Sequence, residues 1–319
     1  MLLFILSQKN LPLAQAEIAS FYSVQKTKEN YVFVSSKKIL DIPLAFTKEI
    51  HDILFFCRRK DLEKHIRKYN WNRKIKGSFC ARSDVQDIER KLGGMIWDIL
   101  QKPIVDLEHP DTLIHFFFIG NAVYAGLRLW KNNNAFLQRK AQLRPGFYPA
   151  SLDPQLALGI VNLSGVKKNA LVVDPFCGTG GILIEAAFSG RKAIGFDISK
   201  WMLKKCTQNL EHYKIKNKVV SVTVGDATTF RKKCAAIVTE LPFGKNTRSQ
   251  DLVLLYSQFL SNAKKNTNIL VVGFPDFIDY IKICRKTGWK IKHDFRWYLH
   301  QTLSKHVVVA TRKIKIKRR

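Results

Sequence analysis

The chain has 319 residues and 46% of them are hydrophobic, which fits two or three folded domains and excludes global disorder. It holds 54 Lys and Arg against 25 Asp and Glu, a net charge of +29. A field of this sign attracts polyanions and favours nucleic acid over an anionic membrane as the partner. Both the first 150 residues and the remainder are basic, so we expect the partner to contact both parts.

Signals for a membrane or a metal are absent from the sequence. The opening apolar run Met1–Leu6 is too short for a secretory signal and fits a first β-strand. No apolar run approaches the length of a membrane span. The six cysteines are scattered without CxxC spacing, which favours reduced thiols and disfavours a zinc site. We therefore expect a cytoplasmic protein with no membrane segment and no metal.

The N-terminal part has the pattern of an α+β region. After the first strand, Leu11–Ile18 is expected to form a helix and Tyr31–Val34 a strand. Helical spacing returns from Val85 to Leu100, and Leu113–Ile119 predicts a buried strand. Asparagines at 132–134 and the Arg-Pro-Gly at 144–146 then indicate a connection, so we expect a domain boundary within 130–150.

Beyond that boundary, short continuous apolar runs alternate with segments that are compatible with helices. These runs are Ala170–Val173, Ala193–Phe196, Val219–Val224, Ala235–Val238 and Ile269–Gly273. Such a pattern is typical of a mainly parallel sheet that is buried on both faces. The basic tail Lys313–Arg319, in which Lys alternates with Ile, carries little specificity.

Three strand ends in this part carry polar groups that suit a nucleoside cofactor. The first ends in Asp174-Pro-Phe-Cys-Gly-Thr-Gly-Gly181, where glycines allow a close backbone approach to a ligand. The spacing is neither GxGxxG nor GxxxxGK[ST], which disfavours a diphosphate cofactor and a nicotinamide dehydrogenase. The next two ends supply Asp197, placed to bind ribose hydroxyls, and Asp226, placed to accept from an adenine amino group. Either acid could instead cap the following helix.

The fourth strand end, Thr239–Arg248, suits a flat base that carries an amine. The ring of Phe243 could stack on the base, while Glu240 and the Leu241 carbonyl accept hydrogen bonds from the amine beside the rigid Pro242. Catalysis would then come mainly from alignment with a methyl donor. The alternative is a turn that ends the strand and buries a core phenylalanine.

A dense basic region in the N-terminal half is a candidate RNA-binding surface, because phosphates attract cations and unpaired bases stack on aromatic rings. The aromatic residues interleaved with it are Phe55, Phe56, Tyr69 and Trp71. The alternative is a solvated helix with core aromatics. The candidate RNA contacts are Arg58, Arg59, Lys60, Lys64, Arg67, Lys68, Arg73, Lys74 and Lys76.

These motifs together resemble class I methyltransferases that act on exocyclic amines, whose fourth motif is Asp/Asn-Pro/Leu-Pro-Tyr/Phe. The nearer resemblance is to THUMP-containing tRNA guanine-N2 methyltransferases, especially the archaeal tRNA (guanine(10)-N2)-methyltransferases. It covers nearly the whole chain. It rests on the glycine turn with Ile182–Glu185, on Gly195–Met202 and on Arg144–Pro149 before the cofactor loop. Phe79–Arg82, Val105–Asp111 and Gly120–Gly126 look like a THUMP domain, and Leu299–Lys305 resembles the family's last hairpin.

The resemblance implies an α/β fold: a Rossmann-like methyltransferase domain preceded by an α+β ferredoxin-like and THUMP region. The expected parts are a ferredoxin-like region (1–48), a THUMP domain (49–130), a linker (131–148) and the methyltransferase domain (149–319). It also implies S-adenosylmethionine as cofactor and tRNA as partner, with the acceptor end on the THUMP domain. We expect the protein to be a monomer. The implied cofactor contacts are Tyr148, Pro149, Asp174, Phe176, Cys177, Gly178, Thr179, Gly180, Asp197, Ile198, Asp226 and Ala227.

One residue departs from the family pattern, because Glu240 stands where Asp or Asn is usual. The extra methylene displaces the carboxylate by about an ångström unless the loop compensates, and a misplacement of that size can cost on the order of a hundredfold in rate. The chain could have adjusted its geometry, changed its substrate or lost activity, and we expect retained activity. Methylation of guanine 6 in tRNA or of rRNA remains open, as does a non-catalytic RNA-binding role. A DNA adenine-N6 enzyme shares the fourth motif but would not need a THUMP-like region.

Overall fold

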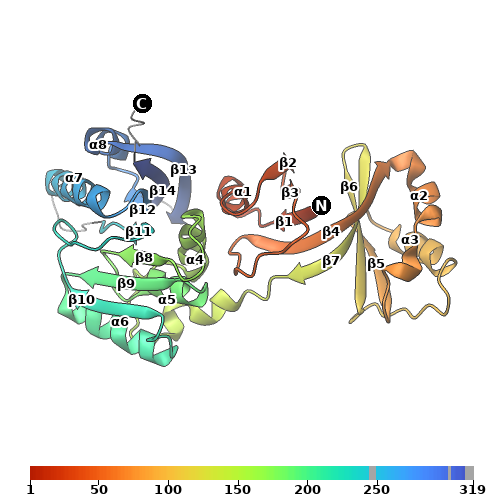
Figure 1. Cartoon of the computed structure of the whole chain (residues 1–319), viewed down its shortest axis with the longest axis horizontal. Coiled ribbons are helices and arrows are strands. Elements are labelled where there is room, and N and C mark those ends of the chain that lie inside the picture. Colours follow the sequence, from red (N-terminus) through yellow and green to blue (C-terminus); the bar gives the residue numbers. More distant parts are fainter. Residues whose placement is uncertain (244–248, 301–302, 313–319) are drawn as a thin grey trace, which may run out of the picture. The chain divides into compact units, whose positions relative to one another are not determined.

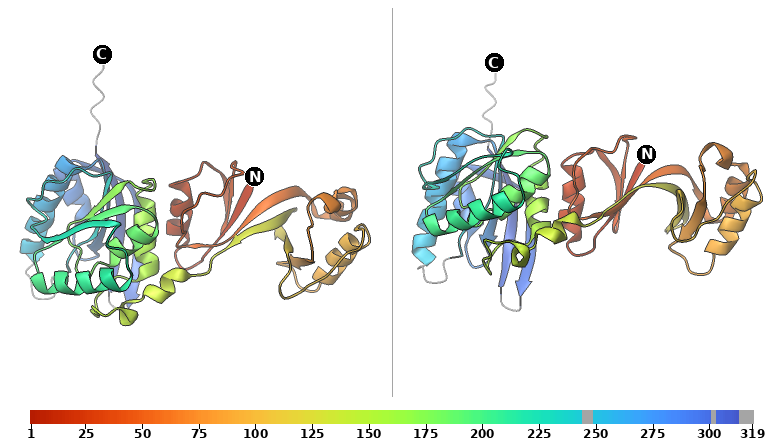
Figure 2. Two further views of the ribbon diagram at one scale, coloured as in Figure 1. Left: turned by 60° about the horizontal axis from the view of Figure 1, so that its bottom comes forward. Right: turned by 90° about the horizontal axis from the view of Figure 1, so that it is seen from below.

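The computed structural model describes residues 1–243, 249–300 and 303–312, and the basic tail 313–319 lies outside the described residues. Figure 1 shows the elements in chain order, and Figure 2 shows them from two further sides. The chain divides into two compact units. The first contains residues 1–11, 22–40 and 47–133, and the second contains residues 12–21, 41–46 and 134–319.

The first unit is built on one seven-stranded sheet with the order β2-β3-β1-β4-β7-β6-β5. Two helices, α2 (Leu62–Lys68) and α3 (Glu89–Trp97), and two 3-10 turns, η1 (Arg59–Asp61) and η2 (Trp71–Arg73), complete it. The strands are β1 (Leu2–Leu6), β2 (Val24–Lys28), β3 (Tyr31–Val34), β4 (Thr47–Arg58), β5 (Phe79–Ser83), β6 (Thr112–Ile119) and β7 (Ala122–Lys131).

The long strand β4 joins the two regions that the sequence suggested for this unit. Its first half pairs with β1 and most of its length pairs with β7. The boundary expected between residues 48 and 49 therefore falls inside one strand, and the division of the unit into ferredoxin-like and THUMP parts stays a prediction. Apolar side chains of α2 and α3, among them Ile66, Leu92 and Ile96, pack against the sheet at Phe79 and Phe116.

The helix expected from Val85 to Leu100 is shorter in the structure and begins at Glu89. Asp87 has a positive φ of 63°, which a right-handed helix does not allow. Just before the expected helix, the carboxylate of Asp84 accepts the backbone N–H of Phe118 in β6 at 2.9 Å. The apolar spacing extends toward the N-terminus beyond Glu89, where the backbone first becomes helical. The expected N-terminal boundary of the helix was therefore wrong.

The second unit is built on a seven-stranded sheet with the order β10-β9-β8-β11-β12-β14-β13, in which β14 alone runs antiparallel to the other strands. Its strands are β8 (Leu171–Asp174), β9 (Lys192–Asp197), β10 (Val219–Val224), β11 (Ala236–Glu240), β12 (Ile269–Pro275), β13 (Trp289–His300) and β14 (Leu303–Arg312). Its helices and turns are α1 (Leu11–Ala19), η3 (Ala135–Arg139), η4 (Ala141–Leu143), α4 (Pro154–Leu163), α5 (Gly181–Phe188), α6 (Lys200–His212), α7 (Ser249–Asn266) and α8 (Tyr280–Thr287).

The predicted mainly parallel α/β sheet of a Rossmann-like methyltransferase is confirmed by this unit. Helices α7 and α8 cover one face through a core that includes Ile237, Tyr256, Leu270 and Ile283. Figure 1 shows α5 and α6 beside β8, β9 and β10. The expectation that every strand is buried on both faces was wrong for β10, where Val220 and Val224 are more than half exposed. That strand forms the edge of the sheet, so helices cover it incompletely.

Two short N-terminal segments belong to this unit and anchor it through a buried acid. Glu17 of α1 accepts the backbone N–H groups of Ala45 and Phe46 at 2.7 and 2.9 Å. The side chain of Asn162 in α4 donates to the same carboxylate at 2.7 Å. Burial raises the pKa of Glu17. The sequence placed both segments in the N-terminal region, because a contact 145 residues away leaves no local signal.

Candidate cofactor and target-base site

The carboxyl ends of β10, β9, β8 and β11 lie side by side at one edge of the second sheet. Asp174 pairs with Gly195, and Val224 pairs with Asp197, which aligns the first three ends. Glu240 ends β11, the neighbour of β8 on the other side. The sheet order therefore brings together the polar strand ends that the sequence singled out, as a doubly wound fold requires for a ligand site.

The loop after β8 needs its glycines for two different reasons. Gly178 and Gly180 both have positive φ, 49° and 86°, which L side chains rarely adopt. A Cβ on Gly180 would lie 2.6 Å from the Cys206 sulfur, so the loop packs directly on α6. A Cβ on Gly178 would meet nothing within 4 Å, which leaves open space for a ligand on that side. Cys177 itself is buried, and its N–H donates to the carbonyl of Phe196.

Asp197 connects this loop to the end of β9. One carboxylate oxygen accepts the N–H of Gly178 at 2.9 Å, and the other accepts the N–H of Ser199 at 2.9 Å. Ser199 caps α6, since its hydroxyl accepts the N–H of Met202. Asp197 is therefore not the helix cap that the alternative interpretation proposed. The next side chain, Ile198, is 77% exposed and offers an apolar surface beside the acid.

Asp174 is enclosed, whereas Asp226 is exposed. The hydroxyl of Thr239 donates to Asp174 at 2.5 Å and the N–H of Phe176 donates at 3.2 Å, so the acid ties the loop to β11. Burial raises the pKa of Asp174 to about 7. Asp226 accepts the N–H and hydroxyl of Thr228, which fixes the turn after β10 while the carboxylate stays accessible.

The segment before the cofactor loop is held against it by Asn209, a residue to which the sequence assigned no role. Its side-chain amide donates to the carbonyl of Thr179 at 2.9 Å and accepts the N–H of Gly146 at 2.8 Å. The hydroxyls of Ser151 and Thr179 lie 3.0 Å apart. These contacts place the segment that contains Tyr148 and Pro149 beside the glycine loop. They join residues far apart in sequence, which is why the motif pattern did not reveal them.

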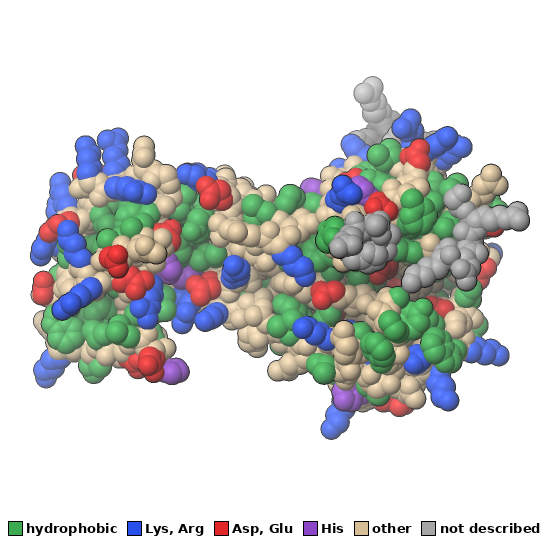
Figure 3. Space-filling model, turned by 180° about the vertical axis from the view of Figure 1, so that it is seen from behind, with side chains coloured by type: hydrophobic (Ala, Val, Ile, Leu, Met, Phe, Trp, Pro, Cys, Tyr) green, Lys and Arg blue, Asp and Glu red, His purple; other side chains and the backbone are tan. Residues whose placement is uncertain are grey.

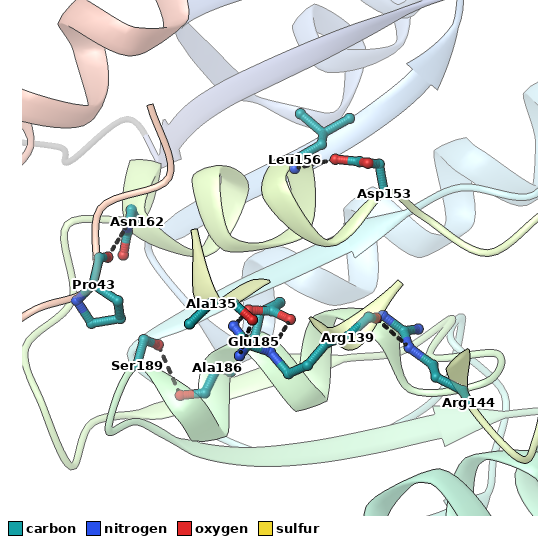
Figure 4. A network of polar contacts seen from close by, with 10 residues as sticks. All are labelled: Pro43, Ala135, Arg139, Arg144, Asp153, Leu156, Asn162, Glu185, Ala186 and Ser189. Carbon is teal, nitrogen blue, oxygen red and sulfur yellow. Dashed lines mark hydrogen bonds and ion pairs between the residues drawn. The ribbon is translucent and has the colours of Figure 1, made fainter. Parts of the chain in front are cut away.

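A buried ion pair holds the chain just before this segment against helix α5. Figure 4 shows Arg139 of η3 and Glu185 of α5 in a two-pronged contact, with nitrogen–oxygen distances of 2.8 and 2.7 Å. Arg144 donates to the carbonyl of Arg139 at 2.8 Å. The helix that follows the glycine loop therefore also holds the chain that precedes it, which restricts the geometry of the ligand site.

The fourth strand end is organised around Glu240 and Phe243. Leu241 is buried and its N–H donates to Gly273, while Tyr256 donates its hydroxyl to the carbonyl of Pro242 at 2.5 Å. Pro242 is exposed and Phe243 is partly exposed. The ring of Phe243 is not enclosed in the core, contrary to the alternative of a core phenylalanine. The rest of the expected motif, 244–248, lies outside the described residues.

Glu240 forms an ion pair with Lys305 of β14. The ammonium nitrogen of Lys305 also lies 5.6 Å from the centre of the Phe243 ring. Lys305 is 4% exposed, and burial lowers its pKa to about 7, while the Asp153 carboxylate acts in the opposite direction. The sequence placed Lys305 in the last hairpin but assigned it no function, because only the sheet order brings it to Glu240.

The candidate RNA region of the first unit lies at the end of β4, on η1 and α2, and around η2. Most of its Lys and Arg side chains are exposed, and Lys74 is partly exposed. Figure 3 shows many Lys and Arg side chains on the face in view, interspersed with Asp and Glu. Trp71 is completely buried, so it was a wrong candidate for stacking on RNA, whereas Phe55 and Tyr69 are partly buried against the same core. Phe56, at 62% exposure, is the accessible ring.

Two family models match the chain. One, described as an RMKL-like methyltransferase domain, matches residues 141–305, and the other, described as a DNA methylase, matches residues 15–209. The second match ends before Glu240, so it does not include the candidate target-base motif. Among solved structures, TrmN from Thermus thermophilus has a TM-score of 0.53 and 18% identity over 97% of this chain and 99% of its own. That likeness concerns the fold.

The fold and these matches define a class I methyltransferase that uses S-adenosylmethionine. The chain is 32% identical to the tRNA (guanine(10)-N2)-dimethyltransferase of Methanothermobacter thermautotrophicus, over 98% of this chain and 99% of that one. It is also 32% identical to the protein of that name from Pyrococcus abyssi, over 78% of this chain and 79% of that one. It therefore belongs to the tRNA (guanine(10)-N2)-dimethyltransferase family, and the resemblance found in the sequence is confirmed.

The described part of the chain shows neither a candidate metal site nor a candidate membrane span. Within residues 1–243, 249–300 and 303–312, no group of three His, Cys, Asp or Glu side chains could hold a metal ion. No helix in the described part of the chain is long and apolar enough to cross a membrane. All six cysteines are free.

Proposed function

We propose that this protein transfers methyl groups from S-adenosylmethionine to N2 of guanine 10 in tRNA. The observation that carries the proposal is the juxtaposition of an intact cofactor loop, Asp174–Gly181, with an acid and an accessible ring at the next strand end. The names of the full-length relatives support guanine 10 and dimethylation. A relative named tRNA (guanine(6)-N2)-methyltransferase is 26% identical over 60% of this chain, so position 6 is the second candidate.

The residues present fit the cofactor at this edge of the sheet. Open space beside Gly178 accommodates a close ligand, and the backbone around it is fixed by Asp197 and Asn209. The exposed side chain of Ile198 suits one face of an adenine, and the accessible Asp226 suits its amino group. When bound, S-adenosylmethionine would supply an electrophilic methyl group. We propose that the cofactor is bound by all the contacts that the family resemblance implies, from Tyr148 and Pro149 to Asp226 and Ala227. The buried Cys177 would contribute through the shape of the loop.

The target guanine would be held by the residues after β11. Phe243 offers a ring for stacking, and the Glu240 carboxylate accepts hydrogen bonds from the exocyclic amine, with the Leu241 carbonyl as a second acceptor. Pro242 keeps this turn rigid, and the hydrogen bond from Tyr256 fixes its carbonyl. A guanine amine is a weak nucleophile, so the contribution of these residues is to align its lone pair and exclude other orientations.

The exposed basic residues of the first unit bear on how the partner is bound. We propose that the basic region at residues 58–76 binds tRNA phosphates and that residues 49–130 act as a THUMP domain for the acceptor end. The net charge of +29 supports a polyanionic partner. We further propose that the protein acts in the cytoplasm as a monomer.

Incubation of the purified chain with unmodified tRNA and labelled S-adenosylmethionine, followed by nucleoside mapping, tests the function. The expected result is label in N2-methylguanine or N2,N2-dimethylguanine at position 10. Label at position 6, in rRNA alone, or in DNA adenine would contradict the proposal. Binding of S-adenosylmethionine by calorimetry without methylation of any RNA would indicate a non-catalytic homologue.

A further inference from the structure

The contact between Glu240 and Lys305 crosses the strand that lies between them. Glu240 is the register partner of Gly273 on β12, and Lys305 is the partner of Pro275 on the same strand. A Cβ on Gly273 would lie 3.4 Å from Cγ and 3.7 Å from Oε1 of Glu240. Both distances are ordinary van der Waals contacts, so the glutamate side chain lies over Gly273 of β12, where the lysine on β14 reaches its carboxylate.

Lys305 is one of the most enclosed charged residues of the second unit. Its side chain is 5% exposed, whereas that of Glu240 is 22% exposed. A buried ammonium needs a compensating partner, because its desolvation otherwise costs several kcal/mol. The partner here is the carboxylate proposed to bind the target amine, and the ring proposed to stack on the base lies 5.6 Å from the same ammonium. One cation therefore contacts both side chains that frame the target base.

We propose that Lys305 is a positioning residue that holds Glu240, together with Phe243, in the orientation for methyl transfer. This inference rests on the proposed function, since it assigns a role within the same site. It also accounts for the departure of this chain from the family pattern. A glutamate has one more rotatable bond than an aspartate, and the ion pair restricts that bond.

The ion pair leaves the carboxylate able to bind a substrate. Lys305 contacts Oε1 of Glu240, so the second oxygen can accept from an amine. The side chain of Glu240 is the more exposed of the two, so a ligand can reach its carboxylate while Lys305 stays covered. A glutamate fixed in this way avoids the loss that a displacement of about an ångström would otherwise cause.

The direct test compares Lys305→Met with Lys305→Arg in the full chain. Methionine is close in length and removes the charge, whereas arginine keeps the charge on a longer side chain. For Lys305→Met we expect kcat to fall ~10- to 100-fold, with the KM for tRNA and the Kd for S-adenosylmethionine changed less than about twofold. Lys305→Arg should retain most of the activity. An effect on KM or cofactor affinity alone, or no effect on kcat, would contradict the inference.

A double-variant cycle shows whether Lys305 acts through Glu240. In a Glu240→Ala background, Lys305→Met should lower kcat much less than in the original chain, because no carboxylate remains to be held. The same fold loss in both backgrounds would mean that the lysine acts independently, and the inference would be wrong. Lys264→Met is the matched control, since Lys264 is also partly buried in this unit but donates to the Thr287 carbonyl. Its kcat should be unchanged.

The failure of this inference and that of the proposed function have different signatures. If the original chain methylates no tRNA, or modifies a different nucleotide, the proposed function fails whatever the variants do. The pairing is then judged by 15N NMR of the Lys305 ammonium, whose resonance should shift in Glu240→Gln. An unshifted resonance would refute the pairing, and thermal unfolding of each variant checks that the fold is retained.

Discussion

The carboxyl group of Asp174 is enclosed between β8 and β11, and this burial has a measurable consequence. Its pKa in the folded protein, about 7, lies above the ordinary value of 3.8. Between these values the folded protein keeps a proton that the unfolded chain has released. The free energy of unfolding therefore falls as pH rises from about 4 to about 7, by up to about 1.4 kcal/mol per pH unit for this group.

Asp174→Asn should remove this contribution, because the amide oxygen still accepts from Thr239 and Phe176 but does not titrate. We expect the variant to gain stability relative to the original chain as pH rises from about 4 to about 7, and to differ little in slope outside this range. Chemical denaturation across the pH series measures the difference. Burial also raises the pKa values of Glu17 and Glu185, so only the difference between the two proteins is diagnostic. Parallel pH profiles for the two proteins would refute the assignment.

The site residues that the sequence could predict are those whose chemistry is visible locally. A glycine turn after an apolar run indicates a ligand loop, and Glu240 to Phe243 form a short contiguous motif. The roles of Lys305 and Asn209 were not predicted, because their partners lie 65 and up to 63 residues away and neither residue type is unusual. Trp71 was misassigned for a related reason, since an aromatic ring between cations has the same local pattern in a core or on a surface.

At the scale of elements, continuous apolar runs predicted the strands of the parallel sheet well. The residue range of β10 was predicted correctly, but its exposure was not. The order of strands decides which of them is the edge, and this order is not visible in the sequence of one strand. The start of α3 was missed because the backbone at Asp87 overrides the apolar spacing. Strand β4 shows why the sequence did not predict that the boundary expected at residue 48 falls inside one strand. Its sequence pattern gives no sign that one strand pairs within both regions.

Two glycines, one in the loop that packs on α6 and one in helix α3, should respond oppositely to alanine. A Cβ on Gly146 would lie 2.3 Å from the backbone carbonyl oxygen of Lys205, so the segment that contains Gly146 and α6 would have to separate. We expect Gly146→Ala to lower the free energy of unfolding by roughly 1–3 kcal/mol and to weaken cofactor binding, because Asn209 holds both Gly146 and the loop.

The matched control is Gly94→Ala in α3, where a Cβ would meet nothing within 4 Å. Alanine is the better helix former, so this change should raise stability by about 0.5–1 kcal/mol and leave cofactor affinity unchanged. Thermal unfolding and calorimetric titration with S-adenosylmethionine measure both effects. Equal responses at the two positions would mean that packing against α6 does not constrain the loop.

At the scale of the whole molecule, positive charge exceeds negative charge in both halves of the chain, so net charge alone does not locate the tRNA. The basic region around η1 and α2 differs from the rest in density, because Arg58, Arg59 and Lys60 are adjacent and exposed. Arg59 also lies over the Phe118 ring at 5.2 Å. Each phosphate contact that is lost lowers the dependence of log affinity on log salt by roughly 0.7–0.9.

Replacement of Arg58, Arg59 and Lys60 by Gln should therefore weaken tRNA binding and reduce the salt slope by up to about 2–3. The comparison is a second triple variant with the same loss of charge, Lys282, Arg285 and Lys286 to Gln on the exposed side of α8. If binding depends only on net charge, both variants will lose the same affinity and slope at every salt concentration. A larger loss for the first variant in fluorescence anisotropy titrations from low to physiological salt would locate a phosphate contact there, and equal losses would exclude that region as a specific interface.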